Sequence, residues 1–316
     1  RVLFRSSSDP GSYYEQLQME LLLAVPGTVI EIPEGVHPIP GQLSLSVDGV
    51  TIRGQGPGRS VLDFKGQQSG AEGLMVTSSH VTLEGFAVVD TVGDGIKLSH
   101  VEDITVRNVA VIWNEGLDRE PGAYGIYPVL TKNVLVEHCV VKGASDAGVY
   151  LGQSENAILR YNYAQRNVIG LEVENSSKVD LYGNTATDNT AGILVVNLPN
   201  LSRIGDSVRV FDNSVTANNG RNFGQEGTFV ADIPPGTGVM VVAYQKVEIT
   251  SNLIANNDTL NLIVVSFPLT GLPANDHSFN PVSSDILITG NRLLMGGKDR
   301  KSTRLNSSHQ IISYAV

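Results

Sequence analysis

The stretch G148-V-Y-L-G-Q-S-E-N156 returns in the same pattern 22 residues later as G170-L-E-V-E-N-S-S-K178. Each copy begins with Gly and an apolar residue, and apolar and polar residues then alternate, which is the pattern of a β-strand. Self-similarity at a constant spacing of 20–50 residues is the signature of a repeat protein. The fold is therefore expected to consist of stacked copies of one small unit.

Further copies extend the pattern in both directions: G95-I-K-L-S-H-V-E-D103, G125-I-Y-P-V-L-T-K-N133, G192-I-L-V-V-N-L-P-N200 and G238-V-M-V-V-A-Y-Q-K246. The steps between successive leading glycines are 30, 23, 22, 22 and 46 residues. A step of 46 is two periods, and a step of 30 is one period with an insertion. One register therefore covers most of the chain.

Asparagine recurs at the end of the strand that follows each copy, and often again five residues later. The pairs are Asn162/Asn167, Asn184/Asn189 and Asn213/Asn218. Asn tolerates left-handed φ, and stacked amides can hydrogen-bond to one another and to the backbone. We expect asparagine ladders at the bends. His138 stands where its repeat would carry the bend Asn, so it is expected to point inward in the ladder, with Cys139 in the core.

These observations predict an all-β fold, a right-handed, single-stranded parallel β-helix over residues 26–300. Residues 7–25 are predicted to form an N-terminal cap, because a solenoid needs its open end covered. Ser12 to Glu15 fits a capping box, and Leu17, Met19 and Leu21 to Leu23 offer an apolar helix face.

The two ends of the sequence resemble translated sequencing-adapter sequence. Residues 1–6 and 301–316 are therefore excluded from the fold prediction, and we expect the natural ends to be missing. Without Arg1, Arg5, Lys301 and Arg304 the net charge changes from −10 to −14. Such a surface repels nucleic acid and anionic membranes. No run of 18 apolar residues is present, so no transmembrane segment is expected.

The chain resembles the bacterial parallel-β-helix-repeat family, with the pectin-lyase-like fold, from about residue 10 to 298. The stretches that carry the resemblance are GAYGIYPV from Gly122, GASDAGVY from Gly143, NTATDNTAGILV from Asn184 and PGTGVM from Pro235. They are most similar to a subgroup of exported β-helix proteins, often lipoproteins, without an established activity. The resemblance implies the fold and an extracytoplasmic location: periplasmic, lipoprotein-anchored or secreted.

A more distant resemblance links one repeat to mannuronan epimerases, whose corresponding stretch looks like Tyr-Gly-Ile-Asp-Pro-His-Asp. Here Tyr124 to Ile126 and Pro128 match, whereas Tyr127, Val129 and Leu130 stand at the Asp, His and second Asp positions. Val and Leu cannot transfer a proton. The resemblance therefore implies the scaffold without that activity, unless Tyr127 has taken over the role of the base.

One row of outward positions carries the candidate site residues. The residue after Gly and an apolar residue faces outward, which gives Lys97, Tyr127, Tyr150 and Glu172 in consecutive coils. Adjacent tyrosines suit stacking on a sugar ring. Lys97 could bind a uronate carboxylate or, like Tyr127, act as a base. An aromatic ladder with solvated charges remains the alternative interpretation.

Glu172 and Glu174 lie two residues apart on one strand, about 7 Å from each other on the same face. That spacing suits an inverting hydrolase pair or a shared Ca²⁺ ion. A solvated acidic face is the commoner arrangement. Ca²⁺ is thus a possible cofactor, and no other cofactor is predicted.

Two insertions are expected to border the outward row. The first, W113-N-E-G-L-D-R-E-P-G122, carries Trp113 and Arg119 and is predicted to be either a cleft wall with substrate contacts or an ordinary surface loop. The second runs from Asn219 to Gly236 and could serve in the same way.

The sequence leaves two functions open. The first is an exported protein that binds or modifies a polysaccharide, with lyase- or epimerase-like chemistry at most. The second is a non-catalytic solenoid that binds a protein partner in the cell envelope. Lys97 or Arg119 beside Tyr127 in a cleft would favour the first, and a flat, open acidic face would favour the second.

Overall fold

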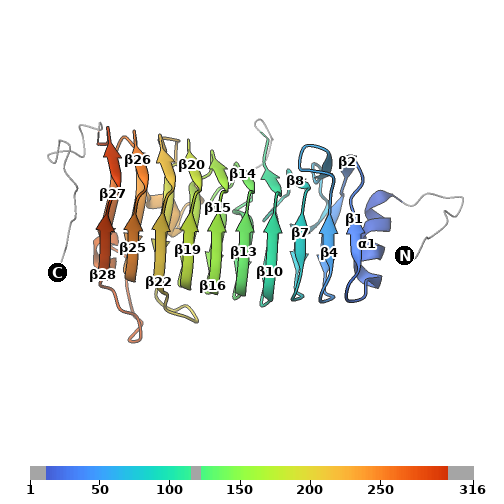
Figure 1. Cartoon of the computed structure of the whole chain (residues 1–316), viewed down its shortest axis with the longest axis horizontal. Helices are drawn as coiled ribbons and strands as arrows, with labels where there is room; N and C mark the ends of the chain where they lie inside the picture. The colour runs from blue at the N-terminus through green and yellow to red at the C-terminus, as the bar shows by residue number, and fades with distance from the viewer. Residues whose placement is uncertain (1–11, 115–121, 298–316) are drawn as a thin grey trace, which may run out of the picture.

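The chain winds into a right-handed parallel β-helix, seen as a rod of stacked coils in Figure 1. The computed structural model describes residues 12–114 and 122–297. Three parallel sheets run along the rod, and each receives one strand from almost every coil. This confirms the predicted fold. Within the described residues, no helix is long and apolar enough to cross a membrane.

Sheet A contains ten strands: β1 (Val29–Glu31), β4 (Thr51–Arg53), β7 (Thr82–Glu84), β10 (Glu102–Arg107), β13 (Lys132–Glu137), β16 (Glu155–Arg160), β19 (Ser177–Tyr182), β22 (Asp206–Phe211), β25 (Gln245–Thr250) and β28 (Ser284–Thr289). Sheet B contains another ten: β2 (Gly35–Pro38), β5 (Ser60–Asp63), β8 (Ala87–Val89), β11 (Ala110–Ile112), β14 (Val140–Lys142), β17 (Tyr163–Gln165), β20 (Thr185–Thr187), β23 (Ser214–Thr216), β26 (Leu253–Ala255) and β29 (Arg292–Leu294). Sheet C contains nine: β3 (Gly41–Leu45), β6 (Ser69–Val76), β9 (Ile96–Ser99), β12 (Tyr124–Val129), β15 (Ala147–Gly152), β18 (Ile169–Glu174), β21 (Ala191–Val196), β24 (Thr237–Val242) and β27 (Leu260–Val265). The helices are α1 (Tyr13–Leu23) and the short 3-10 helices η1 (Phe229–Asp232) and η2 (Phe267–Thr270).

The core lies inside the coil and is built from the inward alternate residues of each strand. In sheet C, Val149, Leu171 and Ile193 follow one another in register, and none is exposed to solvent. Burial of such a side chain stabilises the fold by about 1.5–3 kcal/mol. Because each coil repeats the same inward positions, its side chains also pack on those of the coils before and after.

Two buried asparagine ladders close the bends, as predicted. In the first, each amide donates to the next side-chain oxygen, from Asn162 through Asn184, Asn213 and Asn252 to Asn291, at 2.8–3.0 Å. In the second, Asn167, Asn189, Asn218 and Asn257 are joined in the same way at 2.9–3.1 Å. The same side-chain oxygens also accept backbone N–H groups of the preceding coil, so they satisfy groups that the bends leave unpaired.

The prediction for His138 is wrong. His138 is exposed, has a positive φ of 55° and stacks on Tyr161, with ring centroids 5.2 Å apart. Cys139 occupies the ladder position instead, and its N–H donates to the side-chain oxygen of Asn162 at 3.0 Å. In the next coil Tyr161 has the same positive φ directly before Asn162, so His138 is the left-handed residue before the ladder position and not the ladder residue itself.

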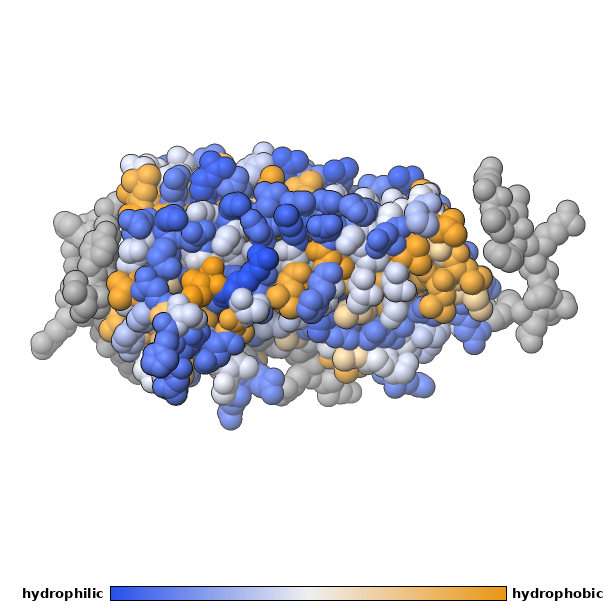
Figure 2. Space-filling model, turned by 90° about the horizontal axis from the view of Figure 1, so that it is seen from below, coloured by the Kyte–Doolittle hydropathy of each residue, from blue (hydrophilic) through white to orange (hydrophobic). Residues whose placement is uncertain are grey.

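Helix α1 covers the N-terminal end of the rod, with the predicted capping box between Ser12 and Glu15. Leu17 and Leu21 are buried against the first coils, but Met19 and Leu22 are 55% and 58% exposed. The apolar face of the helix is therefore narrower than predicted. Figure 2 shows hydrophobic surface gathered at this end of the rod. The stretches 1–6 and 301–316 lie outside the described residues, and the domain limits at residues 7, 25 and 300 stay predictions.

Candidate functional site

The outer face of sheet C brings the predicted row together. Lys97 of β9 pairs in register with Tyr127 of β12, and Tyr150 of β15 pairs with Glu172 of β18. All four side chains point away from the core, so their expected placement in consecutive coils is correct. Their role in binding or catalysis stays a prediction.

Three tyrosines form a continuous cluster on this face. The ring of Tyr124 lies 4.4 Å from that of Tyr127 and 4.6 Å from that of Tyr150, and Tyr127 and Tyr150 are 5.0 Å apart in an edge-to-face arrangement. Tyr124 and Tyr127 are half-buried, whereas Tyr150 is only 4% exposed. Tyr124 is a site residue that the sequence did not reveal, because strand alternation does not place residues three apart on one face.

Lys97 lies at the edge of the tyrosine cluster. Its Nζ lies 5.0 Å from the centroid of the Tyr127 ring, 3.1 Å from Oε1 of Glu72 and 4.0 Å from Oδ2 of Asp94. The ammonium group is thus the cation of an ion-pair cluster and sits over an aromatic face. This geometry suits a hydrogen-bond donor to a ligand better than a proton acceptor.

The phenol of Tyr127 is also better suited to donate a hydrogen bond than to accept a proton. Burial, followed by the negative charges of Asp94 and Glu174, raises the pKa of Tyr127 to about 12. A phenol with that pKa stays protonated at neutral pH and is a weak candidate for a base. The geometry therefore favours Tyr127 as a hydrogen-bond donor.

The acidic residues of this face are not a solvated surface. Glu172 is only 2% exposed, and Glu174 is half-buried and accepts a hydrogen bond from the Tyr150 hydroxyl at 2.6 Å. Burial raises the pKa of both carboxyls. The prediction of a solvated acidic face is therefore wrong, because the surrounding side chains exclude water from these carboxyls.

Two further carboxyls that sequence reasoning missed complete the cluster. Burial raises the pKa of Asp94 to about 6 and that of Asp146 to about 7. Asp94 accepts the N–H of Tyr124 at 3.2 Å, and the Tyr124 side chain partly offsets the effect of burial on the pKa of Asp146. Both precede a sheet C strand by one or two residues, a loop position that the period does not mark. Groups with pKa values near neutrality are characteristic of functional sites.

The geometry offers little support for a metal at this cluster. Among the described residues, only the oxygen and nitrogen ligand atoms of His80, Glu102 and Asp103 come within 4.8 Å of one another as a set of three. That exposed group lies elsewhere, with His80 and Asp103 paired at 3.1 Å. A Ca²⁺ ion shared by Glu172 and Glu174 remains an untested expectation.

Trp113 does not form a cleft wall. It follows β11 directly, is 5% exposed and packs within the main core, where its Nε1 donates to the carbonyl oxygen of Thr91 at 2.9 Å. The expected contact between Trp113 and a substrate is therefore wrong, because the indole lies inside the coil. Arg119 lies outside the described residues.

The second insertion folds back over sheet C. Val230 and Ile233, in and after η1, are each 4% exposed and join a second hydrophobic cluster with Tyr150 and Leu194. Phe267 of η2 joins the same cluster. The outer face beyond Glu172 is thus covered. An apolar hollow of about 350 Å³ remains between η1 and η2, lined among others by Phe229, Met240, Ile263, Val265, Leu269 and Leu272.

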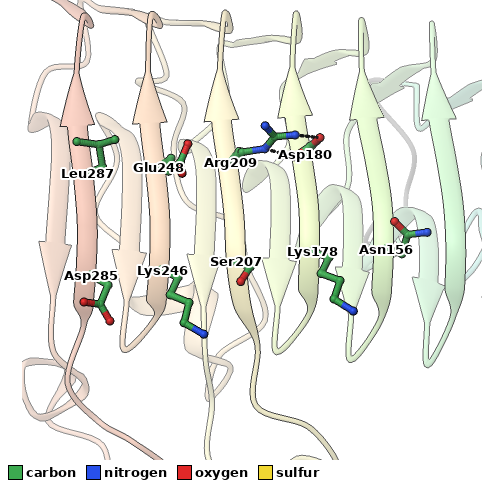
Figure 3. Close-up of a pocket in the computed structure, with 9 residues that line it drawn as sticks. All are labelled: Asn156, Lys178, Asp180, Ser207, Arg209, Lys246, Glu248, Asp285 and Leu287. Carbon is green, nitrogen blue, oxygen red and sulfur yellow. Dashed lines mark hydrogen bonds and ion pairs between the residues drawn. The ribbon is translucent and has the colours of Figure 1, made fainter.

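A second hollow, of about 610 Å³, lies on the outer face of sheet A (Figure 3). Its cations are paired: Lys178 with Glu155 at 2.7 Å, and Arg209 with Asp180 at 2.5 Å. Lys246 similarly contacts Asp206. The charges on this surface therefore alternate and neutralise each other, in contrast to the buried carboxyls of sheet C.

Comparisons with known proteins agree with the architecture. A family model for the right-handed β-helix region matches residues 46–204. The chain is similar to the A-module of the mannuronan C-5 epimerase AlgE4 of Azotobacter vinelandii, at 17% identity with 91% of each chain covered and a TM-score of 0.62. It is also similar to a DFA-IIIase of Arthrobacter chlorophenolicus, at 12% identity with 86% of this chain and 74% of that chain covered and a TM-score of 0.58. At these identities the likeness concerns the fold alone. No curated protein matches the chain in sequence.

Proposed function

This chain belongs to the right-handed β-helix family, and on that premise we propose that it is a carbohydrate-active protein that binds a polysaccharide across the outer face of sheet C. The observation that carries the proposal is the pair of half-buried rings of Tyr124 and Tyr127, 4.4 Å apart, with the buried Tyr150 packed beneath them and Lys97 at the edge. Aromatic rings beside hydroxyl, ammonium and carboxyl groups combine stacking on a sugar ring with hydrogen bonds to its hydroxyls.

The polarity of the neighbouring groups supports the same proposal. Lys97 and Tyr127 both present donors, and the carboxyl groups of Glu72 and Asp94 present acceptors beside them. Lys97 beside Tyr127 is the arrangement that favours a sugar site over a flat acidic face. One of the structural neighbours carries a name that refers to a polysaccharide, a mannuronan C-5 epimerase, which is consistent with the proposal.

Any modification of the bound sugar is proposed to be proton transfer of the lyase or epimerase type. Asp94, with a pKa of about 6, is largely ionised at neutral pH and replaces Tyr127 as the proposed base. Tyr127 and Lys97 then act as donors to the sugar. Asp94 lies 4.0 Å from Lys97, so base and donor border the same position.

The experiment is proton NMR of a panel of neutral and uronate glycans, with and without the protein and with and without Ca²⁺. Selective line broadening is expected for at least one glycan, and new unsaturated or epimerised signals if the protein is an enzyme. Tyr127→Phe tests the hydroxyl, and Gly152→Ala tests the cluster, because its new Cβ would lie 2.3 Å from the Tyr150 ring.

Tyr161→Ala is the matched control. Tyr161 is 49% exposed on the sheet A side of the rod, away from the tyrosine cluster, so this change should leave glycan binding intact. An equal loss of binding in Tyr161→Ala and in the sheet C variants would place the glycan elsewhere. No response to any glycan would remove the carbohydrate proposal.

A second candidate function is that of a non-catalytic solenoid that binds an envelope protein. The hollow on sheet A favours it, because alternating charges such as Arg209 and Glu248 suit a complementary polar protein surface (Figure 3). The charge reversal Lys246→Glu should then weaken partner binding and leave glycan binding unchanged. Retention of a partner by this variant would contradict the second candidate.

We also propose an extracytoplasmic location, periplasmic, lipoprotein-anchored or secreted. The resemblance to exported β-helix proteins supports this proposal, as does a net charge of −10, which suits a freely soluble surface. Detection of the protein in the cytoplasmic fraction of its own host, with none outside the inner membrane, would contradict it.

A further inference from the structure

Two buried carboxyl oxygens in the sheet C cluster have no hydrogen-bond partner. They are Oδ1 of Asp146 and Oε2 of Glu172, and among the described residues the only other buried side-chain atom of this kind is the hydroxyl of Tyr13. A buried polar group without a partner costs about 1–3 kcal/mol, and a charged one costs more. Two such atoms in one cluster therefore require an explanation.

The two carboxyl groups are neighbours. The side chains of Asp146 and Glu172 are within hydrogen-bonding reach of each other. As two ionised carboxylates both would be acceptors only, and neither could satisfy the other. A single proton on one of them supplies the missing donor.

No described cation compensates a charge on Glu172. The neighbouring coils place Tyr150 and Leu194 on either side of it. Lys97, on the same face of sheet C, is engaged with Glu72 and Asp94. The ionisable groups that face the pair from β12, β15, β18 and the loop before β9 are Tyr124, Tyr127, Tyr150, Glu174 and Asp94. All of them are neutral or negative, so they disfavour a second negative charge.

Glu172 is the better place for the proton. It is the more deeply buried of the two, at 2% exposed, while Asp146 is half-buried and also interacts with the Tyr124 side chain, which lowers the pKa of Asp146. A carboxylate that accepts two hydrogen bonds is stabilised in its charged form. Burial and the charges of Asp146 and Glu174 also raise the pKa of Glu172 well above its ordinary value.

We propose that Glu172 is protonated in the folded protein at neutral pH and donates to Asp146, which also accepts the phenol proton of Tyr124. The chain of hydrogen bonds then runs inward from Tyr124, so the Tyr124 oxygen presents a lone pair to the surface. A ligand group at that oxygen must be a donor. Resting on the proposed glycan site, this assigns a sugar hydroxyl, and not a uronate carboxylate, to the position beside Tyr124. Asp146 and Glu172 are positioning residues in this arrangement.

The test uses the protein alone, labelled with ¹³C at the glutamate carboxyl carbon, and follows each carboxyl signal by NMR between pH 5 and pH 9. One signal is expected at the position of a protonated acid at pH 7, and it should be absent from Glu172→Gln. Glu155→Gln is the control, because Glu155 is paired with Lys178 and should remove an ionised signal. If every glutamate carboxyl signal were at the position of an ionised group at pH 7, the proposal would be overturned.

Asp146→Asn keeps the test decisive if Glu172→Gln does not fold. Removal of the negative charge beside Glu172 should move the titration of the protonated signal to lower pH, and an unmoved signal would contradict the pairing.

The preference for a sugar hydroxyl beside Tyr124 is tested with Tyr124→Phe, which should lose about tenfold in affinity for a neutral glycan and less for a uronate. Failure of every glycan to bind would end the proposed function and leave the protonation of Glu172 standing.

Discussion

Arg160 and Glu137 lie in adjacent coils, and Nε and Nη2 of the guanidinium both contact Oε2 of the carboxylate, at 2.7 and 2.6 Å. The other oxygen of Glu137 accepts from Arg107 of the preceding coil at 2.5 Å. One carboxylate thus joins three coils. The Glu137 side chain is 6% exposed, so it is better shielded from water than an ordinary surface ion pair.

Glu137→Gln is expected to lower the free energy of unfolding at pH 7 by about 1–2 kcal/mol, since the half-exposed arginines limit the effect. Burial would raise the pKa of Glu137, but the hydrogen bonds from Arg160 and Arg107 outweigh it and lower the pKa. The stabilisation is therefore present above pH 4.5 and is lost as the pH falls through the lowered pKa. Urea unfolding at pH 7 and pH 3 measures this. Arg59 also lowers the pKa of the exposed Glu34, so Glu34→Gln should show a difference of the same sign but smaller, because water screens an exposed ion pair. A deficit that persists at pH 3 in Glu137→Gln would contradict the assignment.

Asn184→Ala is expected to cost about 2–4 kcal/mol of stability, because it breaks the first ladder at its centre. The change leaves the N–H of Asn162 and the carbonyl of Leu159 without their side-chain partner. Thermal unfolding checks this, with Asn275→Ala, an exposed residue outside both ladders, as the control. A loss of less than about 0.5 kcal/mol would show that water replaces the amide.

Trp113→Phe tests whether Trp113 is only a core residue or also contributes to binding. The change keeps most of the packing but removes the Nε1 donor to Thr91, so a loss of about 1–3 kcal/mol is expected. Affinity for any glycan that binds the wild-type protein should be unchanged at a temperature where both are folded. A selective loss of affinity with normal stability would restore Trp113 to the binding surface.

Asp94→Asn tests the raised pKa of Asp94. Burial is the largest cause, opposed by the Tyr124 N–H and by Lys97, and the pKa rises to about 6. The protonated form is thus favoured by folding, so stability should decline as the pH rises through 6, by about 1–3 kcal/mol in all. Asp94→Asn should flatten that decline. Conversely, the rate of any sugar modification by the wild-type protein should increase as the pH rises through 6, because a base must be ionised. Asp94→Asn should not carry out that modification. A pH profile of stability shared by both proteins would contradict the assignment.

The period of the sequence was sufficient for the architecture and for one row of the site. Alternation within each copy places Val149 inward and Tyr150 outward, and a step of 22 or 23 residues aligns Tyr150 with Glu172 across coils. The asparagine spacing predicted both ladders in the same way. The prediction for His138 failed because this repeat was aligned one residue out of register: His138 corresponds to Tyr161, and Cys139 corresponds to Asn162.

The local pattern on its own thus determined which side of each strand a residue faces, and hence the β-helix, its ladders and the row from Lys97 to Glu172. Only the tertiary structure decided what covers that row: the fold-back of η1 and η2, the inclusion of Tyr124, Asp94 and Asp146, and the burial of Glu172. The reason is physical. Facing outward is a property of strand geometry, whereas exclusion of water, which sets the pKa of a carboxyl, depends on segments from other coils that the repeat does not encode.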